Sequence, residues 1–473
     1  MPGTQGIQDT PGIQDTPGIQ DTARTRYRDE VLEIEPHGIE HIPDAEKHGA
    51  PTRAFTLWFA ANLCMATFVV GVLAPVFGLG LYEAMGAIVL GNALGMTCLA
   101  GVSAMGPRAS VPQMVLTRAS FGYWGTLLPA FFNWAACVGW FAVNTVLGVL
   151  ALRQLLGLPY PVAVALMVVG QVALAVYGYN FIHGYERLMT PVLGVLFLIA
   201  TALTLGKLGG HGHTIVTAGF HPAGFVLLTA AALGYALGWT PYGADYSRYL
   251  PSETSARRVF ALTFLGGFIS AVWIEALGAV ITALALTTSQ NPVAVLTSVT
   301  GLFTAPLLIA IILGTGTSNA LNIYSGALSS LVMGVPLKRP VAAIVIGALG
   351  SVLLLLAGTD PLKLEADFQS FLLVLAYWIG PWLAIMLADF YLVHKGRYVT
   401  AALYRRAGIG WSGLLAYLVG LLASVPFMSQ QLFTGPIAKG LQGADISYYI
   451  GFLVAGALYL LFARSRATTI DHA

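Results

Sequence analysis

The stretch GYALGWTPYGAD, residues 234–245, places three glycines and one proline inside a single long apolar segment. Proline and glycine weaken helices in soluble proteins, but membrane helices tolerate them because neighbouring helices satisfy the freed backbone groups. A second apolar segment, residues 55–79, carries Gly71, Pro75 and Gly78. Paired interruptions in corresponding segments of two halves are typical of a solute site near the membrane midplane. The two stretches therefore predict a transporter-like binding site.

Composition supports a membrane protein. Apolar residues make up 57% of the 473-residue chain and charged residues only 9%, whereas soluble proteins carry about 25% charged residues. Such a chain cannot cover a surface that faces water on all sides. The three cysteines lie in apolar segments and indicate neither a disulfide framework nor a zinc site.

From residue 55 onward the chain is a series of apolar segments. Each approaches the length of about 20 residues that a helix needs to cross the hydrocarbon, and none alternates as a barrel strand would. We predict an all-α integral membrane protein with about twelve transmembrane helices, at 55–79, 82–103, 127–150, 162–181, 190–205, 224–249, 259–286, 300–333, 341–356, 368–393, 411–426 and 448–461.

The ends of the chain and its charges predict the topology. Residues 1–50 are polar and repeat a hexamer at 10–15 and 16–21, which predicts a disordered tail. All but four of the 23 Lys and Arg residues fall on the side of the predicted termini, the exceptions being Arg153, Lys207, Lys363 and Lys439. Because cytoplasmic loops are rich in Lys and Arg, we expect the chain to lie in the cell (inner) membrane with both termini on the cytoplasmic side.

The third segment carries a polar stripe. Asn133, Cys137, Trp140 and Asn144 follow helical spacing, so they share one face, which should face protein or a cavity because amides are costly in lipid. Trp140 offers a flat ring one turn from an amide, the pair that a planar heterocycle needs. Trp239, at the interruption of the sixth segment, would provide a second aromatic wall. The alternative is amide packing between helices.

Two further segments carry polar groups. In the eighth segment Thr315, Ser318 and Asn322 share one face, and clustered hydroxyls beside freed carbonyls suit a sodium ion, although hydroxyl bonding to the helix's own backbone is an alternative. Glu275 lies inside the seventh segment and is a candidate proton site or the partner of a neighbour; both interpretations stay open. Asp245 and Arg248 are interpreted as a structural ion pair.

Several motifs in order carry a resemblance to a known family. They are GPRASVPQM at 106–114, RASFG at 118–122, GWFAVN at 139–144, GYN at 178–180, YER at 185–187 and WTPYGAD at 239–245. With them the chain resembles the nucleobase:cation symporter-1 family, in its purine–cytosine permease branch. The resemblance implies a LeuT-like fold of two inverted five-helix repeats, residues 51–206 and 222–395, followed by two helices at 409–464 and a short cytoplasmic tail at 465–473.

The same resemblance implies roles for individual residues. The substrate would stack on Trp140 and on Trp239 beside Gly238, with edge-on hydrogen bonds from Asn144 and from either Asn319 or Asn322. The cation site would combine the hydroxyls of Thr317 and Ser318 with backbone carbonyls near Phe68, Gly71 and Gly314. The chain lacks the glutamine beside the first interruption that some relatives carry.

The expected function is cation-coupled import of cytosine or a purine-type nucleobase by alternating access. The alternative in the same class is another small heterocycle, such as allantoin, hydantoin, uracil or a vitamin. A membrane-embedded enzyme is disfavoured because no HExxH or GxSxG motif occurs, and a channel because no filter sequence occurs. No cofactor or nucleic-acid partner is expected; the partners are the substrate, a coupled sodium ion or proton, and the lipid bilayer. The oligomeric state stays open.

Overall fold

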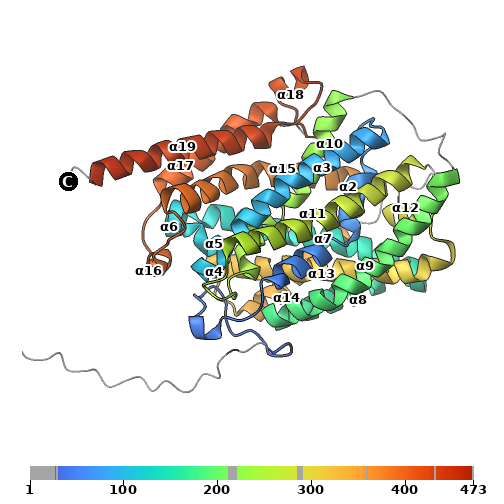
Figure 1. Cartoon of the computed structure of the whole chain (residues 1–473), viewed down its shortest axis with the longest axis horizontal. Coiled ribbons are helices and arrows are strands. Elements are labelled where there is room, and N and C mark those ends of the chain that lie inside the picture. The colour runs from blue at the N-terminus through green and yellow to red at the C-terminus, as the bar shows by residue number, and fades with distance from the viewer. Residues whose placement is uncertain are drawn as a thin grey trace, which may run out of the picture.

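The structure is a computed structural model that describes residues 27, 30–210, 221–284, 291–357, 361–430 and 433–470. Within these ranges, side chains are described except at 208–210, 357, 361–367, 369 and 464–470. Most of the predicted tail, residues 1–26, 28 and 29, and the last three residues of the chain lie outside the described residues. All regular elements in the described ranges are helices, and the long ones lie side by side (Figure 1).

The long helices are α3 (Leu81–Ser103), α7 (Leu127–Leu156), α8 (Tyr160–Tyr177), α9 (Tyr179–Gly210), α10 (Pro222–Leu237), α11 (Ala256–Ala283), α13 (Thr304–Val332), α14 (Arg339–Ala357), α15 (Pro361–Leu387), α17 (Trp411–Ser424) and α19 (Ser447–Ile470). The shorter helices are η1 (Asp44–Glu46), α1 (Thr52–Ala61), α2 (Met65–Val72), α4 (Gly106–Ala109), α5 (Gln113–Leu116), α6 (Arg118–Gly125), η2 (Thr240–Tyr246), α12 (Pro292–Thr297), η3 (Gly301–Phe303), η4 (Ala388–Val393), α16 (Thr400–Tyr404), η5 (Val425–Phe427) and α18 (Pro436–Gly440).

The number of membrane crossings agrees with the prediction. In the described chain nine helices are long and apolar enough to cross a membrane, and α1 and α2 form a tenth span that bends by 59° at a break. Two shorter apolar helices, Trp411–Phe427 and Ser447–Ala463, complete the series. The boundary between the fourth and fifth helices differs from the prediction, because Gly178 has a φ of +90° and ends α8 there. The fifth helix therefore begins at Tyr179 and is long.

Helices from the two halves of the chain interleave in two groups. The first group packs α1, α2 and α3 against α10 and α11, and the second packs α7 and α8 against α13 and α14. Helix α9 contacts α1 of the first group and α13 of the second. Helix α15 packs against α10, and the late helices α17 and α19 pack against each other and against α15. Each group therefore joins segments that lie far apart in the sequence.

One of the two predicted helix breaks lies elsewhere in the structure. The first span is broken at residues 62–64, between α1 and α2, and not at Gly71 or beyond. Gly71 is inside α2, where a Cβ would fall 1.8 Å from the carbonyl oxygen of Glu275, so this glycine allows α2 to approach α11. The second break, at Gly238 and Trp239 between α10 and η2, lies where it was predicted.

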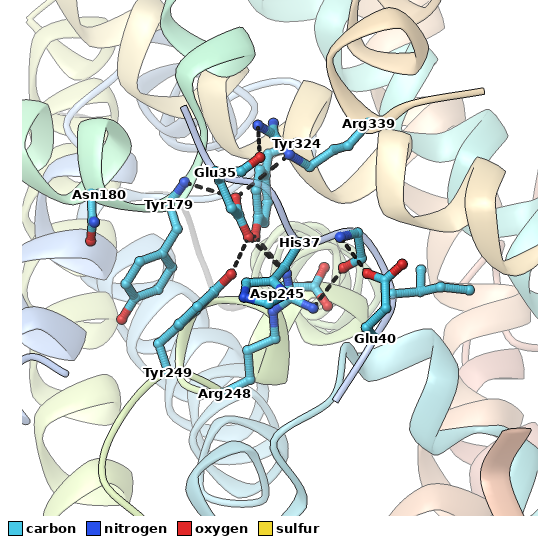
Figure 2. A network of polar contacts seen from close by, with 12 residues as sticks. Glu35, His37, Glu40, Tyr179, Asn180, Asp245, Arg248, Tyr249, Tyr324 and Arg339 are labelled. Atoms are coloured by element: carbon cyan, nitrogen blue, oxygen red, sulfur yellow. Dashed lines mark hydrogen bonds and ion pairs between the residues drawn. The ribbon is translucent and has the colours of Figure 1, made fainter. Parts of the chain in front are cut away.

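The N-terminal segment corrects the predicted boundary at residue 50. Residues 30–50 contact the helices, and Figure 2 shows Glu35 at the centre of a polar network. The buried Glu35 carboxylate lies 2.9 Å from the Arg248 guanidinium and 3.6 Å from that of Arg339. It also accepts hydrogen bonds from the hydroxyls of Tyr249 and Tyr324. Composition alone suggested a free tail because the partner of the Glu35 carboxylate that is nearest along the described chain, the backbone N–H of Tyr179, lies 144 residues away.

This network joins both helix groups. Arg248 follows η2, whereas Arg339 begins α14, so Glu35 bridges the first group and the second. Burial by itself would raise the pKa of Glu35, but the two guanidiniums and the hydrogen bonds outweigh burial and lower that pKa. The carboxylate is therefore ionised at neutral pH. The predicted pairing of Arg248 with Asp245 is wrong: Asp245 accepts from the backbone N–H of Gln113, 2.8 Å away.

Candidate functional site

The break between α1 and α2 places an amide against the second broken span. The buried Asn62 side chain donates to the carbonyl of Trp58 at 2.6 Å, and its oxygen accepts from the indole N–H of Trp239 at 3.1 Å. A broken helix leaves backbone groups without helical partners, and here the side chain at the break satisfies one of them. Asn62 therefore ties the two breaks together and orients the Trp239 ring.

The two predicted tryptophans converge on one tyrosine. Tyr235 lies with its ring centroid 5.6 Å from that of Trp140 and 6.4 Å from that of Trp239, nearly perpendicular to both. Trp140 also meets Phe371 edge-on, with the ring centroids 5.1 Å apart. Gly238 lies at the edge of the Trp140 indole, where a Cβ would fall 3.1 Å from Nε1. The structure thus brings Trp140 and Trp239 together with Tyr235 and Phe371 in an aromatic cluster. Gly238 lies at the edge of this cluster.

Asn144 points toward the same break. Its amide donates to the carbonyl of Trp140 at 3.1 Å, and its oxygen lies 4.0 Å from the Cys64 sulfur. The Tyr235 hydroxyl, also beside Cys64, lies 2.6 Å from the Thr67 hydroxyl. All four residues of the predicted stripe on the third span are buried, as expected. Polar groups from α2, α7 and α10 therefore meet beside the aromatic cluster.

The two candidate amides of α13 differ in their surroundings. The Asn319 amide nitrogen reaches α7 and α8, at the hydroxyl of Thr145 (2.9 Å) and the side-chain oxygen of Gln171 (3.0 Å). The Asn322 oxygen accepts from the hydroxyl of Tyr242 in η2, at 3.1 Å, and its nitrogen donates to Asn319. Asn322 therefore faces the broken sixth span, and Asn319 supports it from behind.

The predicted hydroxyl pair contacts the end of α1. The Ser318 hydroxyl donates to the carbonyl of Ala61 at 2.7 Å, and that of Thr317 reaches the carbonyl of Ala60 at 3.2 Å. Both hydroxyls also lie within hydrogen-bond distance of the Gly314 carbonyl. Hydroxyl and carbonyl oxygens at the C-terminal end of a half-helix are the ligands that transporters use for sodium.

Two predicted members of this cation site lie elsewhere. Phe68 and Gly71 face α11: a Cβ on Gly278 would fall 2.3 Å from the Phe68 carbonyl oxygen. Because the break precedes Met65, the carbonyls freed near Thr317 and Ser318 belong to the end of α1 and not to α2. Gly314 does lie at the break, where a Cβ would fall 2.4 Å from the Leu63 carbonyl oxygen.

Glu275 is fully buried on α11 and faces α3. One carboxyl oxygen accepts from the Asn92 amide at 2.7 Å, and the other has no hydrogen-bond partner among the described residues. An amide can hydrogen-bond either protonation state of a carboxyl group, so this geometry is compatible with proton binding.

The sequence matches one family over most of its length. The family described as permeases for cytosine/purines, uracil, thiamine and allantoin matches residues 41–451. YxlA of Bacillus subtilis (strain 168) is 30% identical over 447 residues, which cover 92% of this chain and 97% of the relative. The purine-cytosine permease fcyB of Emericella nidulans is 30% identical over 453 residues, covering 91% and 88%. The chain belongs to this permease family. It is accordingly a multi-pass membrane transporter and not an enzyme.

A solved structure supports the fold of this permease. MHP1, a nucleobase-cation-symport-1 family transporter in a closed conformation with bromovinylhydantoin bound, aligns with a TM-score of 0.75 at 21% identity. The match covers 92% of this chain and 96% of that chain. The LeuT-like fold that the resemblance implied is confirmed.

The permease has site residues that the sequence analysis missed. Asn62, Cys64 and Tyr235 lie near the breaks and contact predicted residues, and Thr67 lies within hydrogen-bond distance of Tyr235. Asn62 had a usable signal, because an amide inside an apolar segment is costly in lipid, the argument that identified Asn144. Tyr235 had only its position one turn before Trp239.

Proposed function

We propose that this permease imports cytosine or a purine together with a monovalent cation, by alternating access. The observation that carries the proposal is the convergence of Trp140 and Trp239 beside two helix breaks. Aromatic rings bind nucleobases by stacking, worth about 1–3 kcal/mol per base. Asn144 and Asn322 each offer a donor and an acceptor, and the edge of a nucleobase needs both.

The coupled cation is sodium or a proton. The oxygens of Thr317, Ser318, Ala60 and Ala61 support a sodium site at the end of α1. Glu275, with its single amide partner, supports the proton alternative. The bias of Lys and Arg supports an orientation in the cell membrane with both termini in the cytoplasm. In Figure 1 the N-terminal segment and the C-terminal end of α19 lie toward the same end of the bundle, in keeping with an even number of crossings.

A second substrate class is favoured by one observation. The solved relative MHP1 binds bromovinylhydantoin, a heterocycle that is not a nucleobase, within the same fold. The family description likewise includes uracil, thiamine and allantoin. The same aromatic pair in this permease would stack on such a ring.

Uptake of radiolabelled cytosine tests the proposal. Cells that express the permease are compared in sodium and in choline buffer, at neutral and at acidic pH, with unlabelled purines, uracil, allantoin and hydantoin as competitors. The proposal is supported if cytosine uptake is saturable, is inhibited competitively by unlabelled purines, and requires either sodium or acidic pH. Saturable uptake of hydantoin or allantoin alone would move the permease to the second substrate class.

Ser318→Ala is expected to raise the sodium concentration for half-maximal uptake about tenfold, if sodium is the driver. The variant removes one oxygen ligand beside the Ala61 carbonyl, and a hydrogen bond or ligand to a charged partner is worth about 1.5–3 kcal/mol. The sodium dependence of uptake measures the effect. Ser351→Ala on α14, whose hydroxyl donates to the Gly347 carbonyl of its own helix, serves as the control. An unchanged sodium dependence in Ser318→Ala would place the cation elsewhere.

A further inference from the structure

Helix α9 carries a buried carboxyl group that the proposed site does not use. Glu186 is fully buried, and neither of its carboxyl oxygens has a hydrogen-bond partner among the described residues. Removing a bare carboxylate from water costs several kcal/mol unless a positive charge or hydrogen bonds compensate. A proton on Glu186, or a cation beside it, would provide this compensation.

The position of Glu186 connects it with the cation site. On the same face of α9, one turn further, the Thr190 hydroxyl donates to the Thr56 carbonyl of α1 at 3.1 Å. The preceding residue, Tyr185, donates to the Leu313 carbonyl of α13 at 3.2 Å, directly before Gly314. Helices α1 and α13 are the two that carry the hydroxyl pair and its carbonyl partners. Glu186 thus lies at the junction of α1, α9 and α13.

In the part of the chain that the structure describes, no Lys, Arg or His is hydrogen-bonded to the Glu186 carboxyl group. The Cys64 side chain at the break is an ionisable neighbour of Glu186. Tyr235 on α10 contacts Cys64, and α9 itself adds Tyr185 and the buried His183, whose ring lies 4.4 Å from that of Tyr179. Arg187, next along α9, is exposed and points away from the buried side of the helix. Glu275 differs from Glu186 because Asn92 donates to it.

We propose that Glu186 is the carboxylate that neutralises, and thereby senses, the coupled cation. It either takes up a proton itself or faces a sodium ion that the oxygens of Thr317 and Ser318 hold. The inference rests on the proposed symport but goes beyond it, because it assigns the coupling charge to α9. A cation then favours the closed arrangement, since the buried carboxylate is compensated only when the cation is present. Release of the cation follows when the junction opens to water and the carboxylate regains its hydration.

Thermal unfolding of the purified, full-length permease tests cation binding without any substrate. The wild type is expected to melt at a higher temperature in sodium than in choline, or at acidic than at neutral pH. Glu186→Gln should lose that shift and should melt above the wild type in choline at neutral pH, because the amide needs no counter-charge. Glu253→Gln, a change to an exposed carboxylate, should keep the wild-type shift. A shift that persists in Glu186→Gln, or is absent from the wild type, overturns the inference.

Reconstitution into vesicles separates this inference from the proposed function. Glu186→Gln should still exchange labelled for unlabelled base, but a sodium or pH gradient should no longer drive accumulation above equal concentrations. Accumulation at the wild-type level in this variant overturns the role of Glu186 and leaves the symport proposal intact. Loss of coupling in Glu275→Gln instead assigns the coupling charge to α11 and overturns the inference. A wild type that shows the cation shift but exchanges no heterocycle overturns the proposed substrate while supporting Glu186.

The two conditions of the thermal-unfolding test, sodium and acidic pH, identify the cation. A melting shift with sodium at neutral pH that Glu186→Gln abolishes supports a sodium ion facing the carboxylate. A shift only with acid, with sodium inert, supports a proton on Glu186 itself. Either result supports the assignment of the coupling charge to this residue.

Discussion

Trp140→Ala is expected to raise the KM for base uptake about 10- to 100-fold, because stacking on one aromatic ring is worth about 1–3 kcal/mol. The variant also removes the ring that packs against Tyr235 and Phe371, so the remaining aromatic cluster is less well ordered. Saturation kinetics of labelled base measure the change, and surface expression is measured in the same cells.

Two variants sharpen this test. Trp140→Phe keeps an aromatic face and should fall between the wild type and alanine. Trp134→Ala lies on the same helix, but its ring stacks on Phe131, 6.1 Å away and outside the aromatic cluster, so its KM should stay near the wild-type value. An unchanged KM in Trp140→Ala would remove this residue from the binding site.

Glu35→Gln is expected to lower the free energy of unfolding by about 3–5 kcal/mol, the cost of removing one partner from a buried ion pair. The variant keeps the shape of the side chain but leaves the guanidiniums of Arg248 and Arg339 without their carboxylate. Thermal unfolding in detergent measures the loss. Glu30→Gln, an exposed change in the same segment, is the control and should unfold like the wild type. Equal unfolding of Glu35→Gln and wild type would show that residues 30–50 do not anchor the helices.

The contribution of Glu35 has a defined pH dependence. The pKa of this carboxyl group is lowered from its ordinary value of 4.5 in the folded protein, because two guanidiniums outweigh the effect of burial. Such a group adds its full stability above the unfolded pKa and loses it as the pH falls through the lower folded pKa. The difference between wild type and Glu35→Gln should therefore be constant at neutral and weakly acidic pH and shrink only in stronger acid. Acid effects on uptake near neutral pH must come from another group.

Local sequence patterns were sufficient to predict the class of the protein and the buried helix face that carries Trp140 and Asn144. Long apolar segments predicted the helices, since each must satisfy its own backbone in lipid. Spacing along one helix was enough to put Trp140 and Asn144 on a buried face, because residues three or four apart share a face whatever the helix packs against. The second break was also predicted correctly, as Gly238 and Pro241 interrupt that helix within the segment itself.

Only the tertiary structure decided which distant groups meet. The first break falls at Asn62, although no glycine or proline lies there. The groups freed at this break find partners on other segments; the Asn62 side-chain oxygen, for example, accepts from the Trp239 indole. For the same reason the carbonyls beside Ser318 belong to α1. Glu35 anchors its segment to the helices, although the composition of that segment predicts a polar tail. A sequence pattern determines which face of a helix is buried. It does not determine which element covers that face, because that depends on contacts between residues hundreds of positions apart.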